Sequence, residues 1–276
     1  MTRSKPPGKK DAARGRIPAA LRAHFPLNGD HKIASLDLGT GYTSVHMADV
    51  EVKSGKFTNL KSIRPTHFWQ YPGASSHRPE TTTEVPSVCA HRRGETDGSK
   101  ALYGYQADDG GTSDETDALS VVDTMKVALY SGPEADKQKK ILKDLALDVP
   151  YLVSRYRDTK LAEAPETWIL ADYILWLVNL VTIVTANERF GRDLFWVCTI
   201  PSNWDKTSHK LYADILDSAN LEHRYVLQSE VESAVAGLMH RSPVHSTLHD
   251  GEIFFVLDAG KGTSVRSHYV SFLIPC

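Results

Sequence analysis

Two segments of this sequence, far apart along the chain, repeat one pattern: an apolar run, an aspartate near its end and a glycine-rich turn. The first segment spans residues 33–45 and the second spans residues 253–263. One isolated copy is most often a hairpin with a glycine-rich turn. Two copies at the ends of similar strands instead favour a shared binding task.

The residue types in both turns are those that bind a polyphosphate. Glycine lets backbone N–H groups approach a ligand closely, hydroxyl groups add donors, and a carboxylate can hold a magnesium ion through its waters. The first turn supplies Asp37, Gly39, Thr40 and Gly41, and the second supplies Asp258, Gly260, Gly262 and Thr263. The pattern therefore predicts a split site for nucleotide phosphates.

The segments between the two turns add a specific order of motifs. Residues 197–204 end a strand with Ile-Pro, and residues 225–238 lead from a strand through Ser-Glu into a helix of small residues. With Asp-Leu-Gly-Thr before them and Asp-x-Gly after them, this order resembles the actin-like ATPase superfamily and, within it, the seventy-kilodalton heat-shock protein family. The resemblance covers residues 31–265. It implies an α/β, ribonuclease-H-like ATPase lobe that binds ATP or ADP with Mg²⁺.

The resemblance also implies roles for individual residues. Asp37 and Asp258 would hold Mg²⁺ through water from opposite sides of a cleft, and Asp258 belongs with Lys126 and Glu230 to the catalytic set. Lys126 would reach the γ-phosphate, and Glu230 would position the attacking water. The nucleotide contacts would come from Asp37, Gly39, Thr40, Gly41, Tyr42, Gly260, Gly262 and Thr263. The implied reaction is metal-assisted phosphoanhydride hydrolysis, which needs positioning and charge stabilisation and no nucleophilic side chain.

Two of these residues also have plain structural interpretations. A lysine such as Lys126, in an amphipathic segment, is often a solvated side chain whose stem covers the core. Glu230 follows Ser229, a good N-cap, so it would be comfortable as a surface acid at a helix start. Both interpretations stay open on sequence alone.

The second turn departs from the family pattern. Lys261 stands where a glycine is expected and Val265 where an acid is expected, and Cys276 follows only 18 residues after Asp258. A side chain at position 261 opposes close backbone approach to phosphate. We therefore expect a basic tail at residues 1–30, a first lobe at 31–245 and only the start of a second lobe at 246–276. A retained intron or faulty gene model at Gly260-Lys261 is one hypothesis for this ending. If the short form is instead the complete product, we expect weak nucleotide binding and poor hydrolysis, because a one-sided site cannot exclude water or close on its substrate.

Composition restricts the class of protein. A net charge of -2 argues against a dedicated nucleic-acid binder, and three scattered cysteines fit a reducing compartment, with the cytoplasm expected and the nucleus as an option. Residues 167–187 form the most apolar stretch. Asp172 and Asn179 interrupt it, so a buried helix explains it better than a membrane span.

Local patterns predict the order of elements. We expect strands at 32–38, 43–50, 56–63, 85–91, 195–200 and 225–228, helices at 117–130, 134–147, 166–189 and 204–219, and a loop at 67–84.

Three functions remain open from the sequence. The first is the ATP-binding lobe of a heat-shock-type chaperone, with client proteins or co-chaperones as further partners. The second is a kinase of the same superfamily, and the third is a non-catalytic interaction module or vestigial lobe.

Overall fold

A computed structural model describes residues 28–54, 56–66, 83–109, 119–186 and 194–234, together with the backbone of residues 253–258 and 266–271. Most of the expected basic tail, nearly all of the expected loop at 67–84 and the end of the chain lie outside the described residues. So do Gly260, Lys261, Gly262, Thr263 and Val265 of the second turn.

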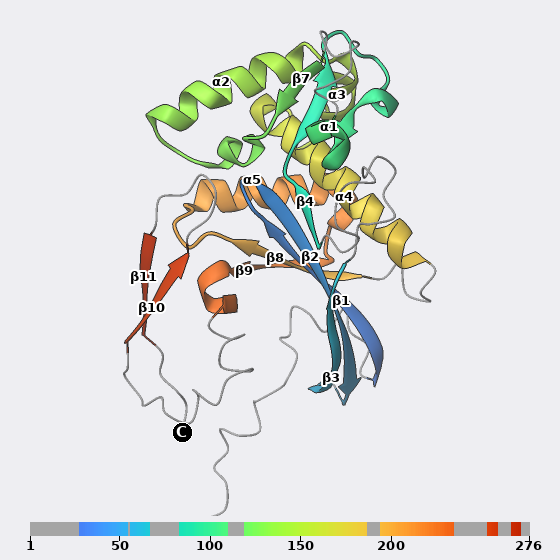
Figure 1. Cartoon of the computed structure of the whole chain (residues 1–276), viewed down its shortest axis with the longest axis vertical. Coiled ribbons are helices and arrows are strands. Elements are labelled where there is room, and N and C mark those ends of the chain that lie inside the picture. Colours follow the sequence, from blue (N-terminus) through green and yellow to red (C-terminus); the bar gives the residue numbers. More distant parts are fainter. Residues whose placement is uncertain are drawn as a thin grey trace, which may run out of the picture.

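The main sheet is mixed and has the order β3-β2-β1-β8-β9 (Figure 1). Its meander consists of β1 (Asn28–Leu38), β2 (Tyr42–Lys53) and β3 (Lys56–Pro65), which pair antiparallel. The short β4 (Glu84–Pro86) also pairs with β2. On the other side of β1, β8 (Phe195–Ile200) and β9 (Tyr225–Ser229) run parallel to it. The expected leading meander and the two later strands are thereby confirmed.

Alternation along β1 separates the two faces of this sheet. Ala34 and Leu36 are fully buried in the large core cluster, whereas Ile33 packs beside a small cluster of Val52 and Phe195. Successive strand residues point to opposite faces, so the large core lies on one side. Two helices pack there, α4 (Trp168–Ala186) and α5 (Lys206–Leu216).

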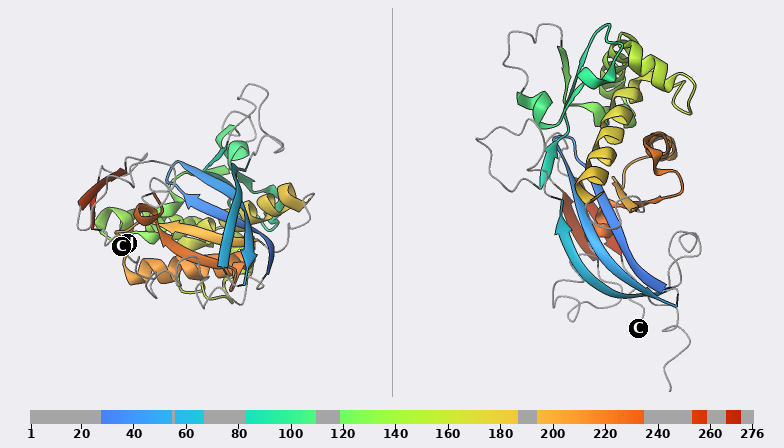
Figure 2. Two further views of the ribbon diagram at one scale, coloured as in Figure 1. Left: turned by 90° about the horizontal axis from the view of Figure 1, so that it is seen from below. Right: turned by 90° about the vertical axis from the view of Figure 1, so that its right-hand side faces the viewer.

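Helix α4 runs from the upper part of the molecule in Figure 1 down along the main sheet, as the side view in Figure 2 also shows. A single-turn 3₁₀ helix (Pro165–Thr167) leads into it. By length and composition the stretch Pro165–Ile183 would suffice to cross a membrane, but most of it is buried inside the fold. Its apolar character is accounted for by packing, as expected from the sequence.

A second, three-stranded sheet has the order β6-β5-β7. It consists of β5 (Cys89–Arg92), β6 (Leu102–Tyr103) and β7 (Leu119–Val122), with a 3₁₀ turn at Gly98–Lys100. Three helices accompany it: α1 (Tyr105–Asp109), α2 (Pro133–Leu147) and α3 (Pro150–Tyr156). The expected strand at 85–91 is in fact two strands, because residues 87 and 88 leave the extended ladder between β4 and β5.

The expected helix at 117–130 is wrong. Within its described part the chain forms strand β7 and then a 3₁₀ helix, Met125–Leu129. The β-branched pair Val121 and Val122 favours a strand, and β5 supplies the antiparallel partner. Helix α3 was not expected, although Pro150 at its first turn is a helix-start signal.

A buried polar cluster ties the second sheet to α3 and α4. Asp172 of α4, 1% exposed, accepts hydrogen bonds from the hydroxyls of Tyr103 and Tyr151 and from the guanidinium of Arg155. The Tyr151 hydroxyl has one proton, which it donates to Asp172. Its oxygen can therefore only accept from Nδ1–H of His91, 2.7 Å away. Burial lowers the pKa of His91 despite the nearby Asp172, which favours the neutral ring with its proton on Nδ1.

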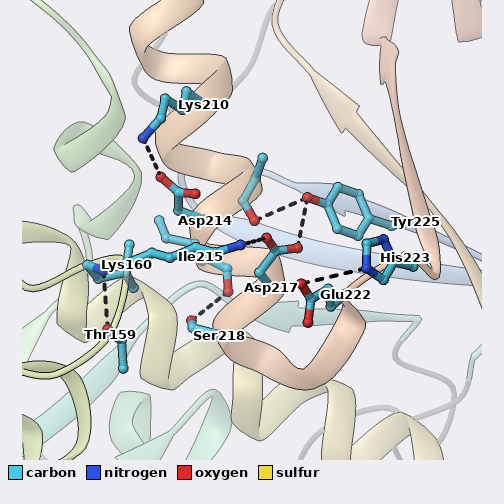
Figure 3. A network of polar contacts seen from close by, with 12 residues as sticks. Thr159, Lys160, Lys210, Asp214, Ile215, Asp217, Ser218, Glu222, His223 and Tyr225 are labelled. Atoms are coloured by element: carbon cyan, nitrogen blue, oxygen red, sulfur yellow. Dashed lines mark hydrogen bonds and ion pairs between the residues drawn. The ribbon is translucent and has the colours of Figure 1, made fainter.

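The end of α5 is fastened by polar contacts that fix the start of β9 (Figure 3). A π-helical turn, Asp217–Leu221, extends α5, and inside it Asn220 departs from helical geometry with a φ of 63°. The Asp217 carboxylate binds Nζ of Lys160 at 2.7 Å and accepts from the Tyr225 hydroxyl at 3.2 Å. These contacts join three segments of the chain and set where β9 leaves the helix.

The strands β10 (Ile253–Asp258) and β11 (Arg266–Ser271) pair antiparallel and form a sheet of their own. Asp258 ends β10 opposite Arg266. That β10 is the first strand of a second lobe stays a prediction.

Candidate functional site

The carboxyl ends of three neighbouring parallel strands meet at one edge of the main sheet. Leu36 of β1 pairs with Cys198 of β8, and Ile200 of β8 pairs with Ser229 of β9. The residues that follow, Asp37 and Glu230, are thereby brought to the same edge. In open α/β sheets, ligands bind outside the carboxyl ends of the strands.

Asp37 is exposed at this edge and is held by a neighbour that sequence reasoning missed. The hydroxyl of Thr199 on β8 donates to Oδ1 of Asp37 at 2.9 Å. The bond fixes one carboxylate oxygen and leaves the other for a ligand or for water. The available signal was the threonine two residues before Pro201, at the end of a strand parallel to β1.

The turn after Asp37 requires glycine at its first position. A Cβ atom on Gly39 would lie 2.2 Å from the carbonyl oxygen of Tyr42, so no other residue fits without a shift. Thr40 and Gly41 complete the turn, and Tyr42 begins β2 with 49% of its surface exposed. The predicted phosphate turn is therefore a tight, sterically defined loop at the sheet edge.

Lys126 and Glu230 lie in contact. Nζ of Lys126 is 3.5 Å from Oε1 of Glu230, and the two side chains are 8% and 23% exposed. Lys126 comes from the 3₁₀ helix, where Met125, Ala128 and Leu129 are buried and hold it in place. Glu230 begins the helix after β9, where Ser229 Oγ accepts from the Glu232 N–H at 3.5 Å, the cap expected from the sequence.

An aromatic group supports this ion pair. Nζ of Lys126 lies 5.7 Å from the centre of the Trp204 ring, within the range of a cation–π contact. The Trp204 ring makes edge contacts with Tyr130 and Tyr212. Trp204 belongs to the turn between β8 and α5, whose first helical turn is capped by Asp205. Sequence reasoning did not assign Trp204 a role.

Tyr212 lies within electrostatic reach of both Asp37 and Glu230. It is fully buried, and its hydroxyl has no hydrogen-bond partner among the described residues. The pKa of Tyr212 is raised, and burial is the largest cause. The nearby Cys198, Asp37 and Glu230 raise this pKa further. Asp37 and Glu230 thus both lie close enough to Tyr212 to act on it electrostatically.

The remaining predicted residues are not brought into this group. Asp258 ends β10, and of it only the backbone is described; Gly260, Gly262 and Thr263 lie outside the described residues. Within the described ranges, no three His, Cys, Asp or Glu side chains gather as a direct metal cluster. The magnesium roles of Asp37 and Asp258 stay predictions.

The observed fold defines a mixed α/β protein with polar residues gathered at the carboxyl edge of its main sheet. No family model matches the sequence, and no curated protein matches it. Among solved structures, the chain is similar to MreB5 of Spiroplasma citri, a structure bound to ADP, with 12% identity and a TM-score of 0.38. The match covers 87% of this chain and 52% of that one, so the chain spans about half its length. A likeness this distant assigns neither a family nor an activity.

Proposed function

We propose that this chain is a nucleotide-binding lobe of the actin-like ATPase type, which binds Mg-ATP or Mg-ADP at the carboxyl edge of its main sheet. The contact between Lys126 and Glu230 carries the proposal. These residues are far apart in sequence, and the resemblance gives both of them roles in one reaction. Asp37 stands at the same edge, near the end of β1, and β8 lies between β1 and the strand β9 that leads to Glu230.

The residues of this edge fit a magnesium-bound phosphate group. Gly39 permits the tight turn, since a Cβ there would lie 2.2 Å from the Tyr42 carbonyl oxygen. Asp37 offers the hard carboxylate oxygen that Mg²⁺ and its waters prefer, and Thr40 offers an amide and a hydroxyl. When bound, Mg²⁺ would supply charge neutralisation at the phosphates. Asp37 would orient its waters, Lys126 would face the terminal phosphate, and Glu230 would accept a hydrogen bond from the attacking water.

A second candidate function rests on the same ion pair. Lys126 and Glu230 already satisfy one another, and Trp204 covers the ammonium group. Such a pair also serves a lobe that binds nucleotide without cleaving it.

A chaperone role in the heat-shock family, with client proteins or co-chaperones as partners, is the finer proposal. The cytoplasm is the proposed compartment, and the free, buried thiols of Cys89 and Cys198 fit it.

The first test is Mg-ATP binding by titration calorimetry of the wild type and three variants. Asp37→Asn and Lys126→Met should each weaken binding by about tenfold or more. Lys137→Met is the matched control, because Lys137 is exposed on α2 and pairs only with Glu134 among the contacts described. Equal affinities for the wild type, Asp37→Asn and Lys126→Met would contradict the assignment of the nucleotide site to this edge of the sheet.

Hydrolysis separates the two candidates. In an ATPase, Glu230→Gln should lower the single-turnover rate by roughly a hundredfold while ATP affinity stays within a few fold. A wild type that binds Mg-ATP through Asp37 but releases no phosphate above a blank supports the non-catalytic lobe.

A further inference from the structure

Ser87 makes three hydrogen bonds around the glycine turn. Its hydroxyl lies 2.8 Å from the carbonyl oxygen of Gly39 and 2.8 Å from Oγ1 of Thr43. Its N–H donates to the carbonyl oxygen of Gly41 at 3.0 Å. Ser87 follows β4, well outside the turn in sequence, and is 4% exposed. One buried residue therefore contacts the turn at both of its glycines, through its hydroxyl at Gly39 and through its backbone N–H at Gly41.

The directions of these bonds follow from the number of protons. A serine hydroxyl has one hydrogen, and only the hydroxyl can be the donor to the Gly39 carbonyl. The Thr43 hydroxyl must then donate to Ser87 Oγ. Thr43 is fully buried, and the hydroxyl of Tyr173 on α4 donates to the carbonyl of Pro86 at 3.1 Å. The bond from Tyr173 holds the peptide between Pro86 and Ser87 against the core helix α4.

The orientation of one amide follows from peptide geometry. The carbonyl of Gly39 and the N–H of Thr40 belong to one planar trans peptide, so they point in opposite directions. Because the carbonyl faces Ser87, the Thr40 N–H faces away from Ser87 and from the buried hydroxyls. Without the serine hydroxyl, the partly buried Gly39 carbonyl would lose this hydrogen bond and the peptide could rotate.

We propose that Ser87 is a positioning residue for phosphate binding: it holds the Gly39–Thr40 peptide so that the Thr40 amide is presented to the ligand. The inference rests on the proposed function and deepens it, because it names the feature that pre-forms the phosphate turn. Ser87 itself does not touch the ligand. The effect of its side chain passes through the Gly39 carbonyl. Pre-organised donors bind more strongly than mobile ones.

The test compares Ser87→Ala with two matched variants. Thr43→Val removes a buried hydroxyl from the same network but keeps the bond from Ser87 to Gly39. Ser62→Ala removes a serine hydrogen bond to Asp49 on the meander, outside this network. Affinity is measured for Mg-ATP and for Mg-pyrophosphate, which tests phosphate contacts alone. Backbone ¹⁵N order parameters of residues 39–41 are measured without ligand.

We expect Ser87→Ala to weaken Mg-pyrophosphate binding by roughly tenfold, with lowered order parameters in the turn. Thr43→Val and Ser62→Ala should stay within about twofold of the wild type. If Thr43→Val, at equal loss of thermal stability, weakens binding as much as Ser87→Ala, the effect is general destabilisation and the inference is overturned. The inference is also overturned if Ser87→Ala binds Mg-pyrophosphate with wild-type affinity and keeps wild-type order parameters in residues 39–41.

Failure of the proposed function gives a different result. If the wild type binds neither Mg-ATP nor Mg-pyrophosphate, the nucleotide site is excluded and the positioning role with it. The order parameters then still decide whether Ser87 fixes the turn, because that measurement needs no ligand.

Discussion

Lys126 and Glu230 form an ion pair in which the lysine is the more deeply buried partner: its side chain is 8% exposed, against 23% for the glutamate. A buried charge is stable only when it is paired. The ammonium group has the carboxylate within 3.5 Å and the Trp204 ring at 5.7 Å. The two supports come from different segments, so the lysine joins the start of the last described helix to the turn before α5.

The Trp204 support predicts an energetic coupling. Trp204→Leu should lower the free energy of unfolding by about 3 kcal/mol, since a large core side chain is lost. Part of that loss, about 0.5–2 kcal/mol, should disappear when Lys126 is already methionine, because no cation is left over the ring. Urea unfolding of the single and double variants measures the coupling. Strictly additive effects would show that the indole does not support the lysine.

The Gly39 turn predicts a selective loss of binding. Gly39→Ala places a methyl group 2.2 Å from the Tyr42 carbonyl oxygen, so the turn must move and Mg-ATP affinity should fall by about tenfold or more. Gly94→Ala is the control. Gly94 has a φ of +73° but nothing within 4 Å of an added Cβ, so it should cost only about 1 kcal/mol of strain. Normal affinity in Gly39→Ala would contradict the assignment.

The hydrogen bond from Thr199 to Asp37 predicts that Thr199 affects metal-dependent binding although it does not touch the ligand itself. Thr199→Val keeps the shape of the strand but frees the Asp37 carboxylate, and we expect affinity for Mg-ATP to fall by about tenfold. Thr182→Val, on α4, removes a hydroxyl that bonds only its own helix in the contacts described. A calorimetric titration that finds both variants equal to the wild type would show that Asp37 needs no such support.

The neutral His91 predicts acid sensitivity. Its pKa is lowered by burial in the folded state, whereas the unfolded chain has the ordinary value of about 6.5. Below that value the unfolded state binds a proton that the folded state does not. The contribution to stability is therefore intact above pH 6.5 and is lost as the pH falls toward the folded pKa. His91→Asn, which cannot gain this charge, should lose less stability between pH 7 and pH 5 in guanidinium titrations. An unchanged pH dependence would contradict the assignment.

Much of the main sheet could be predicted because its signals are local. The meander, β8 and β9 follow alternation and punctuation in the sequence, and the N-cap Ser229 was readable from one residue. The helix expected at 117–130 failed because β7 is only four residues long and depends on pairing with β5.

The parts of the site that escaped prediction are all tertiary contacts. Thr199 matters because β8 lies beside β1, and Ser87 matters because β4 returns to the glycine turn. Neither residue stands out in sequence, since serine and threonine are common at strand ends. The resemblance predicts roles for Lys126 and Glu230 one by one, and their contact is a property of the fold that no local pattern contains.

The order of strands also governs when the protein becomes vulnerable during synthesis. β1 pairs with β2 at once, but its other edge waits for β8, which emerges only after the second sheet and helices α1 to α4. Until then an open strand edge with alternating apolar residues is exposed to other chains. Slow translation between residues 38 and 195 would prolong that interval, so the nascent chain, rather than the finished fold, is where aggregation should begin.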